Sequence, residues 1–533
     1  MIAFFFSFFF LIVYLIVRFT LFLLTDYEWY EKILALSLLL AEIFILIHSF
    51  SYFMNVYLVK KQRSGLNLPK DEVDELVHCP PIALVVASYK EPLPILRDTL
   101  TCFYNISYPN KHLYFLDDTR YELPWDSLEN REKYRSDIEA LCQWFGVNLF
   151  RSKWHGAKAG KINDFLEYLV GHHKPGFELH WNEAQEKSQR EKYLVIFDAD
   201  MNPIPNFAEE LVALGEKNPR AAFIQTPQYY TNFETNRMAR AAGIQQAIFY
   251  EYICEAKNLK EALFCCGTNV LFRVDALLDV GGFDETSVTE DFATSLKLHQ
   301  RGWKSMYLNK VLAFGMGPED LGAYFKQQFR WATGTIGILR TLPSLFFKHF
   351  RRMSISQWWE YFLSCTHYLI GWVFFIMFLC PVCYLMFNTP RYLAYPEIYT
   401  MAYIPYIIQT TFIFFWTMME RKYRPIDLLP ALLINTVAFF VFMKASFYAL
   451  LGIKVHFGIT PKEGAHILSL RSLIPQLIVS LSCVFAFVWG VQRLYYEREL
   501  VYAILVNMIW TVYNFITISF FLYFNHQEWD ESS

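Results

Sequence analysis

Long apolar runs divide this chain into three parts. Residues 2–24 and 33–58 are almost entirely apolar and are long enough to cross a bilayer as helices. From about residue 71 to residue 352, polar and apolar residues mix as they do in a globular domain. Five further apolar runs follow, at residues 361–386, 398–419, 426–451, 473–489 and 501–524. The pattern therefore predicts a globular domain inserted between transmembrane helices.

The predicted segments are two N-terminal transmembrane helices, the globular domain with interface helices, a transmembrane pair, an interfacial helix with a loop, and a second transmembrane pair, at residues 1–60, 71–352, 357–420, 426–470 and 472–525. Lys60, Lys61 and Arg63 follow the second span, and basic residues collect on the cytoplasmic side of membrane proteins. We therefore expect a multi-pass protein of the plasma (inner) membrane, in contact with the lipid bilayer, whose globular domain is cytoplasmic.

The run at residues 426–451 allows two interpretations. Its apolar residues are interrupted by Pro430, Asn435, Lys444 and Ser446. A segment of this kind can lie along the membrane interface instead of crossing the bilayer. We favour the interfacial helix, which leaves six spans in all, although hydropathy alone does not decide between the two.

Within the globular domain, short apolar runs alternate with helical stretches. Strands are expected at residues 82–87, 113–116, 193–197 and 221–225. This alternation predicts an α/β fold with a mostly parallel sheet. No glycine-rich dinucleotide fingerprint or phosphate-binding loop follows any of these runs. A bound nucleotide would therefore have to be held by other groups.

The composition narrows the function classes. Hydrophobic residues make up 54% of the chain, which is more than a typical soluble protein contains and agrees with a membrane location. The formal net charge of -3 gives no reason to expect nucleic acid as a partner. The ten cysteines are scattered, as is usual for free thiols and not for a disulfide framework.

Two carboxylates close the most apolar strand of the domain. Asp198 and Asp200 follow the run at residues 193–197 and are separated by a single alanine. Ligands of open α/β sheets bind at the carboxyl ends of the strands, and two carboxylates there repel unless a cation lies beside them. Mg²⁺ or Mn²⁺ would suit such a pair. Taken alone, the pair could equally cap the turn that follows.

Other chemistry-bearing residues recur along the same domain. Tyr89 and Glu91 follow the first strand, and a ring and a carboxylate there could hold a base. Lys158 lies in a turn of small residues and is available for a phosphate. The remaining candidates are the carboxylates Asp118, Glu290 and Asp291, and the sequence Gln327-Gln328-Phe329-Arg330-Trp331.

Taken together, these motifs make residues 81–340 resemble the processive family-2 glycosyltransferases, within their cellulose synthase-like branch. The matches are a strand-end Asp, Asp-x-Asp, Thr-Glu-Asp and Gln-x-x-Arg-Trp. Phe264-Cys265-Cys266-Gly267-Thr268 is a smaller match. Phe457-Gly458-Ile459-Thr460-Pro461-Lys462 is similar to the cytoplasmic gating loop of cellulose synthases. The resemblance implies a glycosyltransferase-A domain of α/β fold between the transmembrane helices.

The resemblance also implies a role for each matching residue. Asp291 would be the catalytic base, positioned by Glu290, and Asp200 with Asp198 would hold Mg²⁺ or Mn²⁺. The residues implied to bind the nucleotide-sugar are Tyr89, Glu91, Asp118, Lys158, Asp198, Gln327, Arg330, Thr460 and Lys462. Those implied to bind the acceptor are Trp331, Cys266 and Gly267.

Two departures limit the resemblance. The family usually has Asp-Asp-Gly where this chain has Asp117-Asp118-Thr119, which affects the expected uridine contacts. The domain that binds cyclic-di-GMP does not follow the gating loop, so regulation by that nucleotide is not expected.

The implied function is a processive inverting glycosyltransferase. It would transfer sugar from a nucleotide-sugar, with UDP-glucose as the favoured donor, to a growing β-linked polysaccharide acceptor. It would export this polymer across the plasma membrane, and accessory export subunits are candidate partners. UDP-N-acetylglucosamine or GDP-mannose as donor, and a non-processive transferase with a lipid acceptor, are alternatives. A transporter or inactive scaffold belongs to a different class, and the complete set of carboxylates argues against it.

Overall fold

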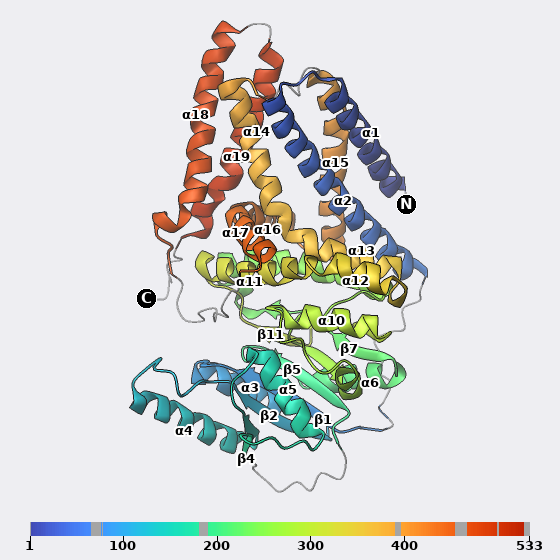
Figure 1. Cartoon of the computed structure of the whole chain (residues 1–533), viewed down its shortest axis with the longest axis vertical. Helices are drawn as coiled ribbons and strands as arrows, with labels where there is room; N and C mark the ends of the chain where they lie inside the picture. The colour runs from blue at the N-terminus through green and yellow to red at the C-terminus, as the bar shows by residue number, and fades with distance from the viewer. Residues whose placement is uncertain are drawn as a thin grey trace.

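The computed structural model describes residues 2–65, 76, 78–180, 190–389, 396–453, 466–497 and 500–526. Figure 1 shows two regions stacked along the long axis of the molecule, an α/β domain and a bundle of long helices. Both ends of the α/β domain connect to the helical bundle, as the hydrophobic pattern predicts.

A mixed sheet forms the centre of the α/β domain. Within the described residues it has eight strands in the order β10-β7-β9-β5-β1-β2-β3-β4. Their bounds are β1 (Ile82–Ser88), β2 (Lys111–Asp117), β3 (Asn148–Arg151), β4 (Glu178–His180), β5 (Tyr193–Asp198), β7 (Ala221–Gln225), β9 (Val270–Arg273) and β10 (Lys304–Tyr307). The β1 strand pairs in parallel with β2 and β5, whereas β9 is antiparallel to both β5 and β7. The expectation of a mostly parallel sheet is confirmed. A small second sheet holds β6 (Asn202–Pro203), β11 (Ala313–Gly315) and β8 (Tyr229–Tyr230).

The sheet is covered on both faces, which explains its uninterrupted apolar strands. Along β5, Val195 and Phe197 pack into one core with Leu100 of α3 (Leu93–Tyr104). The alternate residue Ile196 packs into a second core with Phe165 of α5 (Ala157–Leu169). Because successive strand residues point to opposite faces, both sets must be apolar in a sheet covered on both sides.

The remaining helices of the domain are α4 (Leu128–Phe145), α6 (Phe207–Lys217), α7 (Arg237–Ile248), α8 (Glu255–Leu259), α9 (Val274–Asp279), α10 (Glu290–Gln300), α11 (Leu321–Leu339) and α12 (Leu342–His349). A π-helical segment, η2 (Phe249–Cys254), joins α7 to α8. The start of α11 is fixed by Asp320, whose side chain accepts a hydrogen bond from the Ala323 N–H. An N-cap of this kind satisfies one of the unpaired donors in the first turn of a helix.

In the part of the chain that the structure describes, six helical segments are long and apolar enough to cross a membrane. They are formed by α1 (Ile2–Leu24), α2 (Trp29–Gly65), α13 (Ile355–Thr366) continuing into α14 (Ile370–Phe387), α15 (Pro396–Glu420), α18 (Ile474–Tyr496) and α19 (Val501–Phe524). All six lie where long apolar runs occur. The third begins earlier than its apolar run because Ser354 and Gln357 form a capping box at the start of α13.

The 426–451 run folds as two short helices, α16 (Pro425–Val437) and α17 (Phe439–Leu451), bent by 47° at the break between them. Each has 13 residues, so each is about 20 Å long, which is less than the roughly 30 Å hydrocarbon core of a bilayer. The α17 helix packs on α11, and α16 packs on α7. This geometry is compatible with the interfacial interpretation.

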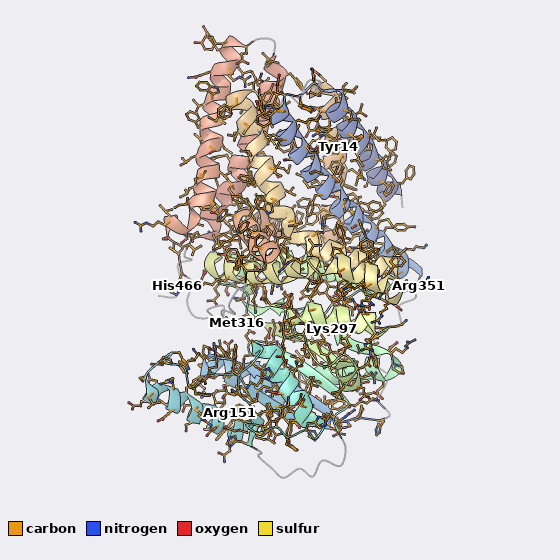
Figure 2. The ribbon with its side chains drawn as sticks, viewed as in Figure 1. Tyr14, Arg151, Lys297, Met316, Arg351 and His466 are labelled. Carbon is orange, nitrogen blue, oxygen red and sulfur yellow. The ribbon has the colours of Figure 1, made fainter. Side chains whose placement is uncertain are left out.

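Figure 1 shows α11, α12 and α13 running across the boundary between the two regions, with α10 on the domain side. Figure 2 places Tyr14 among the long helices and Arg351 at the level of this boundary. The N-terminal residues of α10 therefore lie between the sheet and the membrane helices, where the candidate site is found.

Candidate active site

Adjacent parallel strands bring the predicted carboxylates to one edge of the sheet. Asp198 at the end of β5 is paired in register with Ala87 of β1, and Asp117 of β2 is paired with Ser88. The segments that carry Asp118, Asp200 and Tyr89 therefore leave the sheet side by side. This edge is where open α/β sheets bind their ligands.

The ammonium group of Lys158 connects two parts of the site. In the first turn of α5, its Nζ donates to the Asp198 carboxylate and to the Gly267 carbonyl oxygen, the second at 2.8 Å. Burial would lower the pKa of Lys158, but the carboxylates of Asp198 and Glu290 outweigh burial and raise it. Lys158 therefore remains a cation beside the Asp-x-Asp pair.

Asp291 faces the same loop from the start of α10. A Cβ built on Gly267 would come within 3.0 Å of Asp291 Oδ2, and Gly267 also has a φ of +84°. A glycine satisfies both requirements. Asp291 Oδ1 accepts a hydrogen bond from the Phe292 N–H at 2.8 Å.

The environment of Asp291 suits a general base. Burial first, and then the negative charge of Glu290, raise the pKa of Asp291 to about 7. Burial also raises the pKa of Glu290, while Lys158 and Arg330 oppose this shift. A base is most effective when its pKa lies near the working pH.

The α11 helix supplies the opposite wall. Gly334 lies against Thr289, because a Cβ on Gly334 would fall 2.4 Å from the Thr289 methyl carbon. On the same helix, the Arg330 guanidinium acts electrostatically on both Glu290 and Asp291. The predicted Gln-x-x-Arg-Trp and Thr-Glu-Asp motifs therefore meet in space.

Gln327 and Asp200 both lie near Tyr230. Burial raises the pKa of the Tyr230 hydroxyl, Gln327 opposes this shift, and the charge of Asp200 adds to it. Trp331 is half-buried beside Arg330 on α11. On the acceptor side, the Cys266 N–H donates to Gln225 Oε1 at 2.8 Å, and its carbonyl accepts from Gln228 Nε2 at 3.0 Å. The loop that carries Cys266 and Gly267 is thus fixed through its main chain.

The nucleoside candidates lie further along the same edge. The Tyr89 ring has Lys90 Nζ at 5.1 Å and the Arg120 guanidinium carbon at 5.9 Å from its centroid. The Glu91 carbonyl accepts from the Tyr134 hydroxyl at 2.7 Å. These contacts hold the segment after β1 in place.

Asp118 and its neighbour Asp117 have different partners. Asp117 is bound by Arg151, Tyr121 and the Thr119 N–H, which is a structural arrangement. Asp118 instead lies 3.7 Å from Lys161 Nζ, and burial raises the pKa of Asp118 to about 6 although Lys161 opposes the shift. Of the pair, only Asp118 is therefore suited to a ligand.

The donor set fits a hard divalent cation. Among the described residues no cluster of three or more His, Cys, Asp or Glu side chains could enclose a metal ion. Mg²⁺ commonly takes one or two carboxylates and completes its shell with water and substrate phosphate. Asp198 and Asp200 could supply the protein's share, and Lys158 would lie next to the phosphates.

The sequence motifs did not reveal every residue of the site. Lys161, which faces Asp118, lies one helical turn after Lys158, and this spacing is the signal that could have identified it. Tyr230 was given no role from the sequence. Thr460 and Lys462, predicted to close over the diphosphate, lie outside the described residues.

Comparisons with known proteins identify the chain as similar to glycosyltransferases. A model of glycosyl transferase family 2 matches residues 83–281, and a model of glycosyl transferase family group 2 matches residues 193–443. Cellulose synthase 2 of Novacetimonas hansenii is 26% identical over 91% of this chain and 28% of its own length. A cellulose synthase catalytic subunit (UDP-forming) of Pseudomonas fluorescens is 24% identical over 92% of this chain and 62% of its own length. The chain thus spans less than two thirds of either relative.

Among solved structures, a mannosyltransferase from Pyrobaculum calidifontis in complex with GDP-Man and Mn²⁺ superposes with a TM-score of 0.48 at 14% identity, covering 78% of this chain and 100% of that one. The assignment rests instead on the two family models, the cellulose synthase relatives and the membrane helices around the α/β domain. On these grounds the chain is a membrane-bound family-2 glycosyltransferase of the cellulose synthase-like branch.

Proposed function

We propose that the protein polymerises glucose from UDP-glucose into a β-linked polysaccharide and exports the product across the plasma membrane, with its glycosyltransferase domain in the cytoplasm. The observation that carries this proposal is the cluster of Lys158, Asp198, Gly267 and Asp291 beneath α11. The named activity of the cellulose synthase relatives supports the donor and the polymer.

In the proposed reaction, Asp291 accepts the proton of the acceptor hydroxyl. The hydroxyl oxygen forms a bond to the anomeric carbon of the donor, while the bond between that carbon and the diphosphate oxygen breaks. The electron pair leaves with the nucleoside diphosphate, and the configuration at the anomeric carbon inverts. Lys158 and Arg330 stabilise the negative charge that develops on the diphosphate.

Asp198 and Asp200 are the residues that would hold the divalent cation. When bound, Mg²⁺ or Mn²⁺ supplies Lewis-acid stabilisation of the departing diphosphate. The Tyr89 ring and the Glu91 and Asp118 carboxylates would hold the nucleoside. Trp331 would stack on the acceptor sugar next to Cys266 and Gly267, and Thr460 and Lys462 would exclude water from the donor.

The position of the site supports the export step of this proposal. A growing glycan is too polar to cross lipid unaided. The acceptor candidates lie next to α10 and α11, which border the long helices in Figure 1. A polymer that leaves Trp331 would therefore enter the helical bundle directly.

The test is incorporation of radiolabelled UDP-glucose into high-molecular-weight product by the purified protein with Mg²⁺ or Mn²⁺. Linkage-specific glucanases then identify the bond. We expect wild type to make polymer and Asp291→Asn to lose at least 10²-fold in rate, roughly the contribution of a general base. Polymer made equally by Asp291→Asn would overturn the mechanism.

The same assay distinguishes the alternatives. Incorporation from UDP-N-acetylglucosamine or GDP-mannose alone would keep the mechanism and change the donor. Transfer of a single sugar to extracted lipid would replace the processive function. Metal removal by EDTA is expected to abolish polymer formation, with recovery on addition of Mg²⁺ or Mn²⁺.

A further inference from the structure

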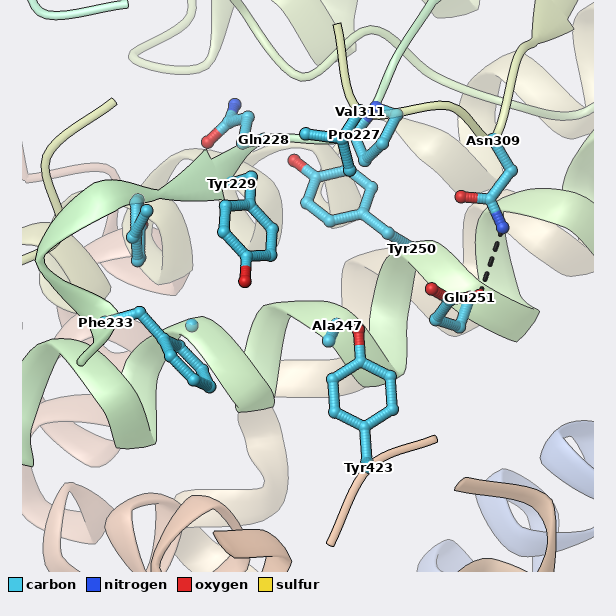
Figure 3. Close-up of a pocket in the computed structure, with 12 residues that line it drawn as sticks. Pro227, Gln228, Tyr229, Phe233, Ala247, Tyr250, Glu251, Asn309, Val311 and Tyr423 are labelled. Atoms are coloured by element: carbon cyan, nitrogen blue, oxygen red, sulfur yellow. Dashed lines mark hydrogen bonds between the residues drawn. The ribbon is translucent and has the colours of Figure 1, made fainter. Parts of the chain in front are cut away.

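A cavity of about 230 Å³ lies beside the site, at the junction between the α/β domain and the turn after α15 (Figure 3). It is lined by Pro227, Gln228, Tyr229, Tyr230, Phe233, Gly243, Ala247, Tyr250, Glu251, Asn309, Val311 and Tyr423. We call it the tyrosine cavity. None of the reaction steps above uses it.

Five of its twelve lining residues are aromatic. In Figure 3 the rings of Tyr229 and Phe233 lie on one side of the space, and those of Tyr250 and Tyr423 lie on another. Tyr229 is 40% exposed, so a solute can reach the wall from outside. Aromatic faces pack well on the C–H faces of small ring compounds while tyrosine hydroxyls remain available for hydrogen bonds.

Besides the tyrosine hydroxyls, the polar side chains of the cavity are two amides and one carboxylate, and that carboxylate is paired with an arginine. Glu251 Oε2 lies 3.0 Å from Arg421 Nη1, and Asn309 Nδ2 donates to the same oxygen at 3.1 Å. Because the charge is balanced, the cavity favours a neutral hydroxyl-bearing ligand over a cation held in an aromatic cage.

The size of the cavity limits the ligand to a single ring. Pockets for drug-sized molecules usually measure about 300–1,000 Å³, which exceeds the volume found here. A pyranose offers apolar faces for the aromatic rings and a rim of hydroxyls for Gln228 and Asn309. These properties together match one neutral sugar unit.

The tyrosine cavity shares a wall with the loop at residues 264–268, which carries Cys266 and Gly267. Tyr250 lines the cavity and lies next to the Cys266 thiol: Cys254 and burial raise the pKa of that thiol, and Tyr250 opposes the shift. Gln228 lines it as well and donates from Nε2 to the Cys266 carbonyl at 3.0 Å. The next residue, Gly267, faces Asp291. Tyr250 also belongs to the π-helical η2, and such segments are frequent at functional sites.

We propose that the tyrosine cavity binds one neutral sugar ring and that its occupancy fixes the position of the loop at residues 264–268. The binding is independent of the donor assigned above, whereas its effect on transfer rests on the proposed function. The residues that line the tyrosine cavity include none of the proposed acceptor residues Trp331, Cys266 and Gly267.

The binding test uses methyl β-D-glucopyranoside and the full chain in nanodiscs of phosphatidylethanolamine and phosphatidylglycerol. This composition avoids maltoside detergents, which carry sugars, and choline lipids, which carry quaternary ammonium groups. Saturation-transfer NMR and calorimetry are the readouts. We expect binding to wild type and to the control Ala247→Ser, and at least tenfold weaker binding to Ala247→Phe, whose ring fills the space. Val311→Phe fills the same space from another segment. Loss of binding in both variants would not be explained by a folding defect of Ala247→Phe alone.

The outcomes distinguish binding in the tyrosine cavity from binding at the proposed acceptor and catalytic residues. Trp331→Ala and Asp291→Asn are expected to retain the binding. Equal binding by wild type and both cavity-filling variants, loss of binding in Trp331→Ala, or no binding at all would overturn the proposal. Binding of tetramethylammonium or uridine in place of the glucoside, abolished by Ala247→Phe, would overturn the assignment of the ligand as a sugar.

The coupling test compares polymer formation with and without saturating glucoside. We expect at least a twofold rise in wild type and no change in Tyr250→Phe, which keeps the ring in the cavity wall and removes the hydroxyl next to Cys266. Equal stimulation of Tyr250→Phe and the cavity-filling variants would overturn the coupling. Intact glucoside binding by a wild type that transfers no sugar would count against the proposed function alone.

Discussion

Thr289 lies directly against the main chain of Gly334, so closely that a Cβ on Gly334 would fall 2.4 Å from its methyl carbon. This contact sets the separation between the start of α10, which carries Glu290 and Asp291, and the middle of α11, which carries Arg330. Gly334, which has no assigned chemical role, thereby sets the distance between Arg330 and the proposed base Asp291.

The first prediction follows from this contact. Gly334→Ala has to displace α11 from α10, and we expect about 1–3 kcal/mol of destabilisation together with a lower transfer rate. The control is Gly337→Ala on the same helix, where an added Cβ meets nothing within 4 Å. Thermal unfolding and initial rates measure both effects. Equal behaviour of the two variants would mean that the spacing is not critical.

The second prediction concerns Lys158, whose ammonium group lies between the end of β5 and the loop at residues 264–268. Lys158→Gln removes the charge that faces Asp198 and lies near Glu290, and we expect the turnover rate to fall by roughly 10²–10³-fold. Lys153→Gln, at an exposed position just before α5, should retain wild-type rates. A small loss of turnover with a large rise in KM would instead assign Lys158 to donor binding alone.

The sequence predicted those parts of the molecule that depend on local patterns. Five apolar residues before Asp198 identified a strand covered on both faces, and the spans at residues 2–24 and 501–524 coincide with α1 and α19. The strand-end carboxylates could also be placed at a common edge, because parallel strands have a common direction.

Contacts between distant segments could not be predicted in the same way. Lys158 bonds the carbonyl of Gly267, 109 residues away, and no periodicity encodes such a pairing. The tyrosine cavity likewise needs the turn with Tyr423 to pack against η2. The different roles of Asp117 and Asp118 depend on Arg151 and Lys161, which reach them only in the folded sheet.

The third prediction is the pH dependence of transfer. Burial and the charge of Glu290 raise the pKa of Asp291 to about 7, and a general base acts only when it is deprotonated. The rate should therefore fall as the pH decreases below about 7. Glu290→Gln removes the negative neighbour, so the acid limb of its rate profile should move to lower pH. An unmoved limb would show that another group titrates.

The last prediction concerns the joint between the domain and the membrane helices. Glu360 of α13 is 1% exposed and accepts from Lys257 Nζ of α8 at 2.8 Å and from Lys260 Nζ at 2.5 Å. Glu360→Gln leaves these ammonium groups without their counter-charge, and breaking a buried pair costs about 3–5 kcal/mol.

Thermal unfolding in nanodiscs should show this loss, because Lys257 itself is 3% exposed and water cannot replace the carboxylate. The matched control is Glu261→Gln, which removes the exposed partner of Lys304 and should cost less than about 1 kcal/mol. If both variants unfold at the same temperature, the joint is held by apolar packing, such as that of Phe292 against Tyr361 at 5.3 Å between ring centroids. In that case the ion pair would only determine which residues meet across the boundary.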